Sequence, residues 1–350
     1  MNKRERKRRG NTIRARQRAY NRRRHKKVPL QRIGKTHLSP IGVTQTLQPS
    51  AEPLSPPKDF RLLSNTEACI NFFKKVRGRE KAIAKNNRLE IRIDLSRIEQ
   101  IDFASTMMLD AICDELASTE PICNVYGSSP RNEKCYQYLA DSGFLDNKYN
   151  KYGRKYPELG HSANIKIERG QAKLKDEDIR KVVEIEKRIC RHVTGTDGKK
   201  FRHINMIKEI CGNTVDWSDA AHDQWIYGTK FEEGKVIVVA LDLGKGILES
   251  ISRKFSDMIK DMLDNYSHVE ILEGAFNRKY GSKSGMPNRN RGLPSIKYAN
   301  ENGDIKDLVV ITNNVVIDFT DKDKCFKFVS NKSRGFNGTL YSWCIDSSCY

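Results

Sequence analysis

The sequence lacks several features that would each have placed it in a known class. No apolar run in its 350 residues approaches the roughly 18–20 residues that a membrane-spanning helix needs, and its first residues lack the apolar core of a signal peptide. The nine cysteines are odd in number and include no C-x-x-C pair, which disfavours a disulfide framework or a zinc site. We therefore expect a cytoplasmic protein with reduced thiols, among which only Cys344 and Cys349 are expected to be exposed.

Positive charge is concentrated at the start of the chain. The net charge is +20, and residues 1–27 contain fourteen Lys or Arg and the single acid Glu5, which leaves about +7 for the rest by subtraction. A block of this density cannot bury itself, so residues 1–28 are predicted to form a basic disordered arm. Its natural partner is nucleic acid or a ribosome, bound through phosphates because Tyr20 is the arm's only aromatic residue. A solvated tail that aids solubility is the alternative, and no membrane partner is expected.

Composition and periodicity divide the rest of the chain. Residues 29–58 contain six prolines and are predicted to be an extended linker. Residues 59–149 alternate between helix and strand patterns, which predicts an α/β module with a parallel sheet. The expected helices are Thr66–Val76, Met107–Leu116 (amphipathic) and Asn132–Leu139, and the expected strands are Leu89–Leu95 and Ile122–Tyr126. Residues 150–170 are polar and are predicted to be a connector.

The sequence of residues 59–149 resembles that of a STAS (anti-anti-sigma-like) domain. The resemblance is carried by Asp94-Leu95-Ser96, by Ile101-Asp102 before Ser105-Thr106-Met107, and by Gly127-Ser128-Ser129-Pro130 before Ser142-Gly143-Phe144. In regulatory members of that family, a phosphorylated Ser or Thr follows the Asp of an Asp-Ser-Ser/Thr-Gly turn. Here that position is Ala104 and the glycine is missing, so Ser105 is expected to cap the next helix rather than accept phosphate. The resemblance therefore implies a module for a protein partner or for self-association.

Residues 171–350 carry a second ordered set of patterns. A helix is predicted over Lys173–Cys190, whose apolar stripe is expected to pack in a core or, as the alternative, to form a dimer seam. Another is predicted over Phe201–Trp217, where Glu209 and Asn213 share one face because they are four residues apart. A strand of β-branched residues ends in Asp242-Leu243-Gly244-Lys245-Gly246-Ile247, and a helix pattern over Ile247–Leu263 follows. A glycine-rich basic segment (279–292) leads to a helix near Leu293. Strands are then expected at Leu308–Ile311, at Val315–Phe319 and after Gly338-Thr339.

This order resembles the histidine-kinase-like (Bergerat-fold, GHKL) ATP-binding domain. The fold class predicted for the chain is therefore α/β: a STAS-like module followed by a Bergerat-fold sandwich, in which helices cover a mixed sheet. The resemblance implies ATP and Mg²⁺ as cofactors, with Asn213 coordinating the metal and Glu209 orienting or deprotonating the attacking water. It also implies that Asp242 accepts a hydrogen bond from the adenine amine, and that Gly244 and Gly246, followed by Ile247, clear room for the base.

The same resemblance implies a lid over the phosphates and a further contact between the protein and the adenine. Thr339 would hydrogen-bond near the adenine edge that Asp242 contacts. Phosphates would be wrapped by the lid residues Lys283, Arg289, Arg291, Gly292 and Leu293, although the lid glycines are more widely spaced than is usual in the family. A sensor histidine kinase is not expected, because His192 and His203 lack the signature of a phospho-accepting histidine.

The leading hypothesis is an ATP-binding regulatory protein that switches conformation with ATP and hydrolyses it slowly, in bacterial stress or phage-defence signalling. One alternative is a serine/threonine protein kinase similar to the anti-sigma-factor kinases. Another is a nucleic-acid-binding scaffold that acts through the basic arm and has a vestigial nucleotide site. The presence of Glu209 disfavours a vestigial site, because a site that only binds nucleotide does not need it.

Overall fold

The computed structural model describes most of the chain from residue 52 onward. The described residues are 52–85, 88–118, 121–146, 148–150, 156, 164–170, 174–217, 225–254, 267–277, 292–328 and 336–350. The predicted arm (1–28) and most of the predicted linker lie outside them. Within these ranges, no helix is both long and apolar enough to cross a membrane.

The first module is built on a sheet with the order β1-β4-β6-β7, in which all neighbours are parallel, as predicted. Its strands are β1 (Pro53–Leu54), β4 (Arg88–Asp94), β6 (Cys123–Ser128) and β7 (Tyr149–Asn150), and β3 (Ile83–Lys85) pairs antiparallel with β4. Ile91, Ile93 and Leu95 are buried on one face, as expected for the strand predicted over Leu89–Leu95. Strand β1 lies inside the predicted linker, because Leu54 is apolar enough to be buried beside Ile93.

Three helices accompany this sheet, together with the short parallel pair β2 (Asp59–Phe60) and β5 (Gln100–Ile101). They are α2 (Thr66–Arg77), α3 (Phe103–Ser118) and α4 (Glu133–Asp141). Ser105 does not cap α3 as predicted: Asp102 does, since its Oδ1 accepts the Ser105 N–H at 2.7 Å, while the Ser105 hydroxyl is buried and donates to the Asp102 carbonyl at 3.0 Å. The helix predicted at Met107–Leu116 is less amphipathic than expected, because α3 is buried round most of its circumference and only Asp110, Asp114 and Glu115 of this stretch stay partly exposed.

The second module is built on a seven-stranded sheet with the order β13-β12-β11-β14-β10-β9-β8. In chain order the strands are β8 (Ile165–Gly170), β9 (Trp225–Glu232), β10 (Lys235–Asp242), β11 (Lys306–Asn313), β12 (Val315–Asp318), β13 (Phe326–Lys327) and β14 (Phe336–Asp346). Strand β8 falls in the predicted connector. All six neighbouring pairs are antiparallel, so the predicted mixed sheet is wrong. The reason is the last strand: β10 and β11 run in the same direction, but β14 lies between them in the opposite one.

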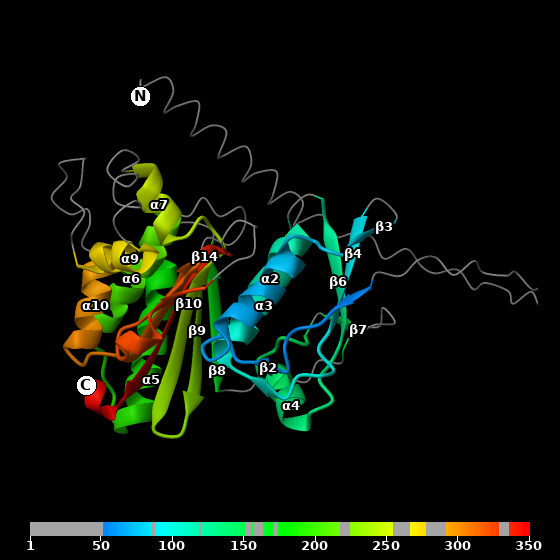
Figure 1. Cartoon of the computed structure of the whole chain (residues 1–350). Helices are drawn as coiled ribbons and strands as arrows, with labels where there is room; N and C mark the ends of the chain where they lie inside the picture. The colour runs from blue at the N-terminus through cyan, green and yellow to red at the C-terminus, as the bar shows by residue number, and fades with distance from the viewer. Residues whose placement is uncertain are drawn as a thin grey trace, which may run out of the picture. The chain divides into compact units, whose positions relative to one another are not determined.

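Helices cover one face of this sheet, as predicted (Figure 1). They are α5 (Asp176–Thr194), α6 (Phe201–Trp217), α7 (Ile247–Lys254), α9 (His268–Phe276) and α10 (Gly292–Glu301). Strand β10 shows how the faces alternate, because Val236, Val238 and Ala240 pack with these helices in one core. Val182, Ile185 and Ile189 of α5 belong to the same core, which confirms that the stripe on this helix is core packing.

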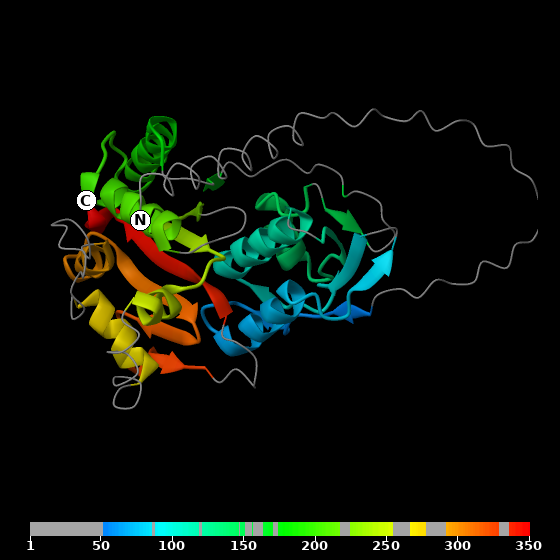
Figure 2. The same ribbon diagram turned by 90° about the horizontal axis from the view of Figure 1, so that it is seen from above.

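The other face of the seven-stranded sheet packs against α2 and α3 of the first module (Figure 2). Val239 and Leu241 of β10 share a buried core with Phe73 of α2 and Met107 of α3. Gly228 of β9 marks the closest approach, since a Cβ there would lie 2.7 Å from the Met107 sulfur and 2.9 Å from the Phe103 ring. Helix α3 therefore lies between two sheets, and the two modules share one core.

All nine cysteines are free, as predicted. Seven are buried and two, Cys325 and Cys344, are partly exposed. The expectation that Cys349 is exposed is wrong, because the short 3₁₀ turn at Ser347–Cys349 folds its side chain into the core beneath α5.

Candidate functional site

Three polar side chains are buried together at the aligned ends of β10, β14 and β11. Asp242 pairs with Thr339 across the β10–β14 ladder, and Thr339 pairs with Thr312 across the β14–β11 ladder. Asp242 is 6% exposed, Thr339 3% and Thr312 0%. The alternation along β10 puts Asp242 on the face covered by helices, two residues beyond the buried Ala240. We call these three residues the strand-end group.

Asp242 is the ionisable member of this group. Its carboxylate accepts the N–H of Gly244 at 2.8 Å and a hydrogen bond from the Thr339 hydroxyl. Burial raises the pKa of Asp242 from its usual 3.8 to about 7, although these two hydrogen bonds and the charge of Arg77 act in the opposite direction. Burial of an ionised carboxylate destabilises the folded state, and buried groups with such perturbed pKa values concentrate at functional sites.

The loop after Asp242 is attached to the end of β11 by two residues that the sequence analysis missed. The Ile247 N–H donates to the Thr312 hydroxyl at 2.9 Å, and the Leu248 N–H donates to Asn313 Oδ1 at 3.0 Å. The Asn313 amide in turn donates to the Lys245 carbonyl at 2.8 Å. The available signal was Asn313-Asn314 between two apolar runs, which is typical of a two-residue hairpin loop.

Two glycines of the predicted motifs have a structural reason to be glycine. Gly246 has φ +80°, and a Cβ there would lie 2.7 Å from Cγ of Asn313, so a side chain at this position would collide with Asn313. Gly338 has φ +145°, and a Cβ there would lie 2.5 Å from the Asp242 carbonyl oxygen. The predicted Gly338-Thr339 strand start thus lies directly beside Asp242. Gly244 is buried in the same loop.

A second group forms where α6 meets α10. Glu209 and Asn213 lie one turn apart on α6, as predicted, and both side chains reach the first residue of α10. A Cβ added to Gly292 would lie 2.7 Å from Asn213 Nδ2 and 2.9 Å from Glu209 Oε2. Among the described residues Asn213 Nδ2 has no hydrogen-bond partner although the atom is buried. Leu293, next to Gly292, packs at the edge of the second core.

The structure therefore brings the predicted site residues together as two groups, both on the helix-covered face of the sheet. Lys283, Arg289 and Arg291 of the predicted lid lie outside the described residues. No cluster of three or more His, Cys, Asp or Glu side chains suited to a metal occurs in the described ranges. Asn213 can offer its side-chain oxygen to Mg²⁺, an ion that keeps several waters and takes few protein ligands beside substrate phosphates. Its buried Nδ2, which has no partner among the described residues, is a donor and suits a phosphate oxygen.

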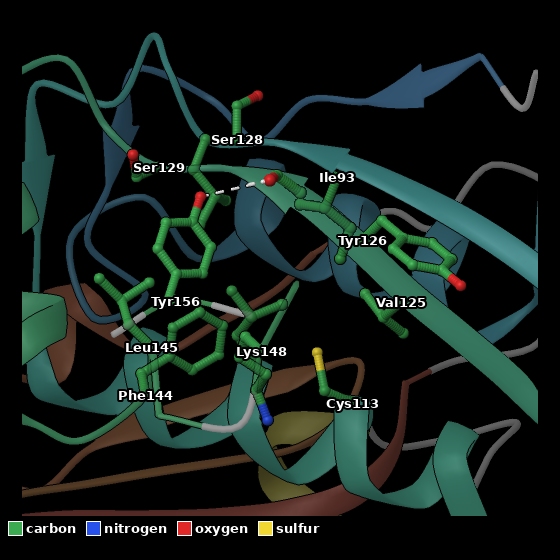
Figure 3. Close-up of a pocket in the computed structure, with 13 residues that line it drawn as sticks. Ile93, Cys113, Val125, Tyr126, Ser128, Ser129, Phe144, Leu145, Lys148 and Tyr156 are labelled. Carbon is green, nitrogen blue, oxygen red and sulfur yellow. Dashed lines mark hydrogen bonds between the residues drawn. The ribbon is translucent and has the colours of Figure 1, made fainter. Parts of the chain in front are cut away.

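The first module contains a cavity of about 30 Å³, which has room for one or two water molecules (Figure 3). The Tyr156 hydroxyl donates to the Gly127 carbonyl at 3.3 Å on one side of it. Cys113 lines another side, and burial raises the pKa of this thiol to about 12, which makes it a poor nucleophile. The Lys148 ammonium is paired with Asp110 at 3.0 Å. The size and the paired charges exclude this cavity as a nucleotide site.

No protein-family model matches this chain, and no curated protein matches it.

Proposed function

We propose that the second module is an ATP-binding module of the histidine-kinase-like (Bergerat-fold) type, and that the first is a STAS-like module for a protein partner or self-association. ATP with Mg²⁺ would act as a conformational switch. The observation that carries this proposal is Asp242, a buried carboxylate at the ends of three strands, beside two hydroxyl groups and a loop that begins a helix. A buried carboxylate contributes no apolar contact to the core and loses its hydration, so ligand binding explains its position better than packing does.

The chemistry of the strand-end group suits adenine. An ionised Asp242 is purely a hydrogen-bond acceptor, and the exocyclic amine of adenine is a donor. Guanine has an acceptor oxygen at the equivalent position, which would face the carboxylate unfavourably. The Thr339 hydroxyl can donate or accept beside it. We therefore expect the site to bind ATP in preference to GTP.

The group on α6 suits the phosphates and the water. Asn213 would hold Mg²⁺, which supplies positive charge to the phosphates when bound. Glu209 is exposed one turn earlier and would orient the attacking water or take its proton. Gly292 begins α10 beside both side chains, and the positive end of a helix at this position suits a phosphate. A slow ATPase is the activity that this arrangement supports.

The first test is calorimetric titration of the full chain with ATP and Mg²⁺. Wild type is expected to bind, Asp242→Asn and Asn213→Ala to lose binding, and Glu209→Ala to bind but not to hydrolyse. Equal binding by wild type and Asp242→Asn would rule out the assignment.

Two glycines of this region give a matched pair of variants. Gly292→Ala places a methyl group against Asn213 and Glu209 and is expected to weaken ATP binding. Gly212→Ala lies on α6 between these same two residues, where a Cβ meets no atom of the structure within 4 Å, and is expected to leave binding unchanged. Equal effects of both substitutions would show that the binding site does not include the start of α10.

The same preparation tests the two alternatives. Transfer of labelled phosphate from ATP to a protein would identify a kinase; Ser105 is not expected to be the acceptor, because its hydroxyl is buried and hydrogen-bonded to Asp102. Salt-sensitive binding of nucleic acid that disappears on deletion of residues 1–28, and that ignores ATP, would support the scaffold.

A further inference from the structure

Arg77, the last residue of α2, connects the first module to the end of the second sheet. Its Nε and Nη2 donate to the two oxygens of Glu115 on α3, at 2.6 and 2.8 Å. Its Nη1 donates to the Asn337 carbonyl and its Nη2 also donates to the Leu243 carbonyl, both at 2.5 Å. One guanidinium therefore holds a carboxylate and two backbone carbonyls. The Arg77 side chain is 22% exposed and that of Glu115 is 14% exposed, so the cluster is largely withdrawn from water.

The two carbonyls flank the strand-end group. Leu243 directly follows Asp242, and Asn337 lies two residues before Thr339. The β10–β14 ladder ends at the pair formed by Asp242 and Thr339, so beyond this point no ladder hydrogen bond holds the two strands together. Arg77 bridges them there, from the face of the sheet opposite to the helices.

Arginine suits this bridge in a way that lysine does not. Five N–H donors in a planar fork can serve a carboxylate and two carbonyls at once, whereas an ammonium group on a flexible stem cannot hold all three in fixed directions. The packing of α2 does not depend on Arg77, because Phe72, Phe73 and Val76 of the same helix are buried in the shared core. The polar cluster is therefore an addition to a contact that apolar burial already secures.

We propose that Arg77 is a positioning residue of the strand-end group, supplied by the first module, which fixes Asp242 relative to Thr339 and makes nucleotide affinity depend on α2 and α3. The dependence on nucleotide rests on the ATP site proposed above, whereas the positioning can be measured without ligand. Among the described residues, the groups that act on the Asp242 carboxylate are the Gly244 N–H of its own loop, the Thr339 hydroxyl and the Tyr341 phenol of β14, and the charge of Arg77 of α2. Arg77 is the one cation among these four.

The variants are Arg77→Met, which keeps an apolar stem, and Arg77→Lys, which keeps the charge. Arg169→Met is the matched control. Arg169 on β8 pairs with Asp110 and Asp114 of α3 and so also joins the modules, but it lies two strands away from β10.

The first readout is the dissociation constant of MgATP between pH 6 and 9. Arg77→Met is expected to weaken binding at least about tenfold and to move the midpoint of its pH dependence upward, because the charge of Arg77 lowers the pKa of Asp242. Arg77→Lys is expected to restore the midpoint but not the full affinity, and Arg169→Met to change neither.

The second readout is hydrogen exchange of the ligand-free protein over residues 236–246 and 336–346. Arg77→Met is expected to speed exchange at both strand ends, and Arg169→Met is not. If wild type does not bind ATP, the proposed function fails, and the exchange data still decide whether Arg77 positions the strand ends. Wild-type exchange in Arg77→Met would overturn the inference, and so would a wild-type pH profile of ATP binding.

Discussion

Replacement of Asp242 by Asn is expected to stabilise the fold, and to do so by an amount that depends on pH. The folded-state pKa of Asp242 is raised to about 7 from its usual 3.8, so the folded protein holds a proton that the unfolded chain releases. Below about pH 4 the carboxyl group is protonated in both the folded and the unfolded state, so its ionisation does not affect the free energy of unfolding. As the pH rises from 4 to 7, the unfolded chain ionises first and the free energy of unfolding falls by about 1.4 kcal/mol per pH unit.

The full cost of Asp242 above pH 7 is therefore on the order of 4 kcal/mol. Asn is nearly the same size and cannot ionise, so the stability of Asp242→Asn relative to wild type should grow through this window and then level off. Urea unfolding of the ligand-free proteins at pH 5, 6, 7 and 8 measures the difference. Other titrating groups are common to both proteins and cancel.

Asp346→Asn is the control with the opposite sign. Lys306, at 2.7 Å, and Ser348 lower the pKa of Asp346 to about 2, so its contribution to stability is complete above pH 4 and is lost only in strong acid. The Lys306 side chain is 42% and that of Asp346 33% exposed, so the loss of this pair should cost less than about 1 kcal/mol, and the same amount at every pH from 5 to 8. A difference between wild type and Asp242→Asn that is equally flat over this range would refute the view that Asp242 is a desolvated carboxylate.

Three further outcomes test other parts of the structure. Gly228→Val should destabilise the protein by about 1–3 kcal/mol in urea unfolding, because its side chain would overlap Met107 where the modules meet; wild-type stability would mean that α3 does not approach β9 this closely. His203→Phe should cost about 3–5 kcal/mol in the same assay, because the ring donates to the buried Glu186 at 3.0 Å, and a value under 1 kcal/mol would contradict that pairing. ATP affinity should rise from pH 6 to 7 and level off above it in calorimetry, since ionised Asp242 is the better acceptor; a flat wild-type profile would contradict this role.

Elements with a strong local signal were predictable from the sequence. Helix α6 has the bounds that its periodicity indicates, and β10 has a run of β-branched residues followed by a glycine-containing turn. Strand β8 was missed because it is an edge strand: only Ile165 and Ile167 contact the core, so its sequence is as polar as that of a connector.

Other features depend on neighbours that are distant in the sequence. Helix α3 is apolar over most of its circumference because sheets from two modules cover it. A periodicity argument that assumes one broad solvent-exposed face therefore overestimates how amphipathic it is. Asn313 is visible in the sequence as a hairpin residue, but its contacts with Lys245 and Leu248 join segments more than sixty residues apart. The same holds for Arg77, whose partners are on α3, β14 and the loop after β10.

The position of α3 restricts how the proposed ATP switch could work. Separating the modules would expose the face of α3 that packs on the second sheet, and the cost is about 1.5–3 kcal/mol for each large apolar side chain such as Phe103 or Met107. An effector typically supplies only about 1–3 kcal/mol of coupling free energy. Two such side chains already match or exceed that amount, and Leu241 and Leu340 of the sheet would be exposed with them. An ATP-dependent change therefore has to act through local elements, namely the α6–α10 contact at Gly292 and the strand ends held by Arg77, while the two modules stay together.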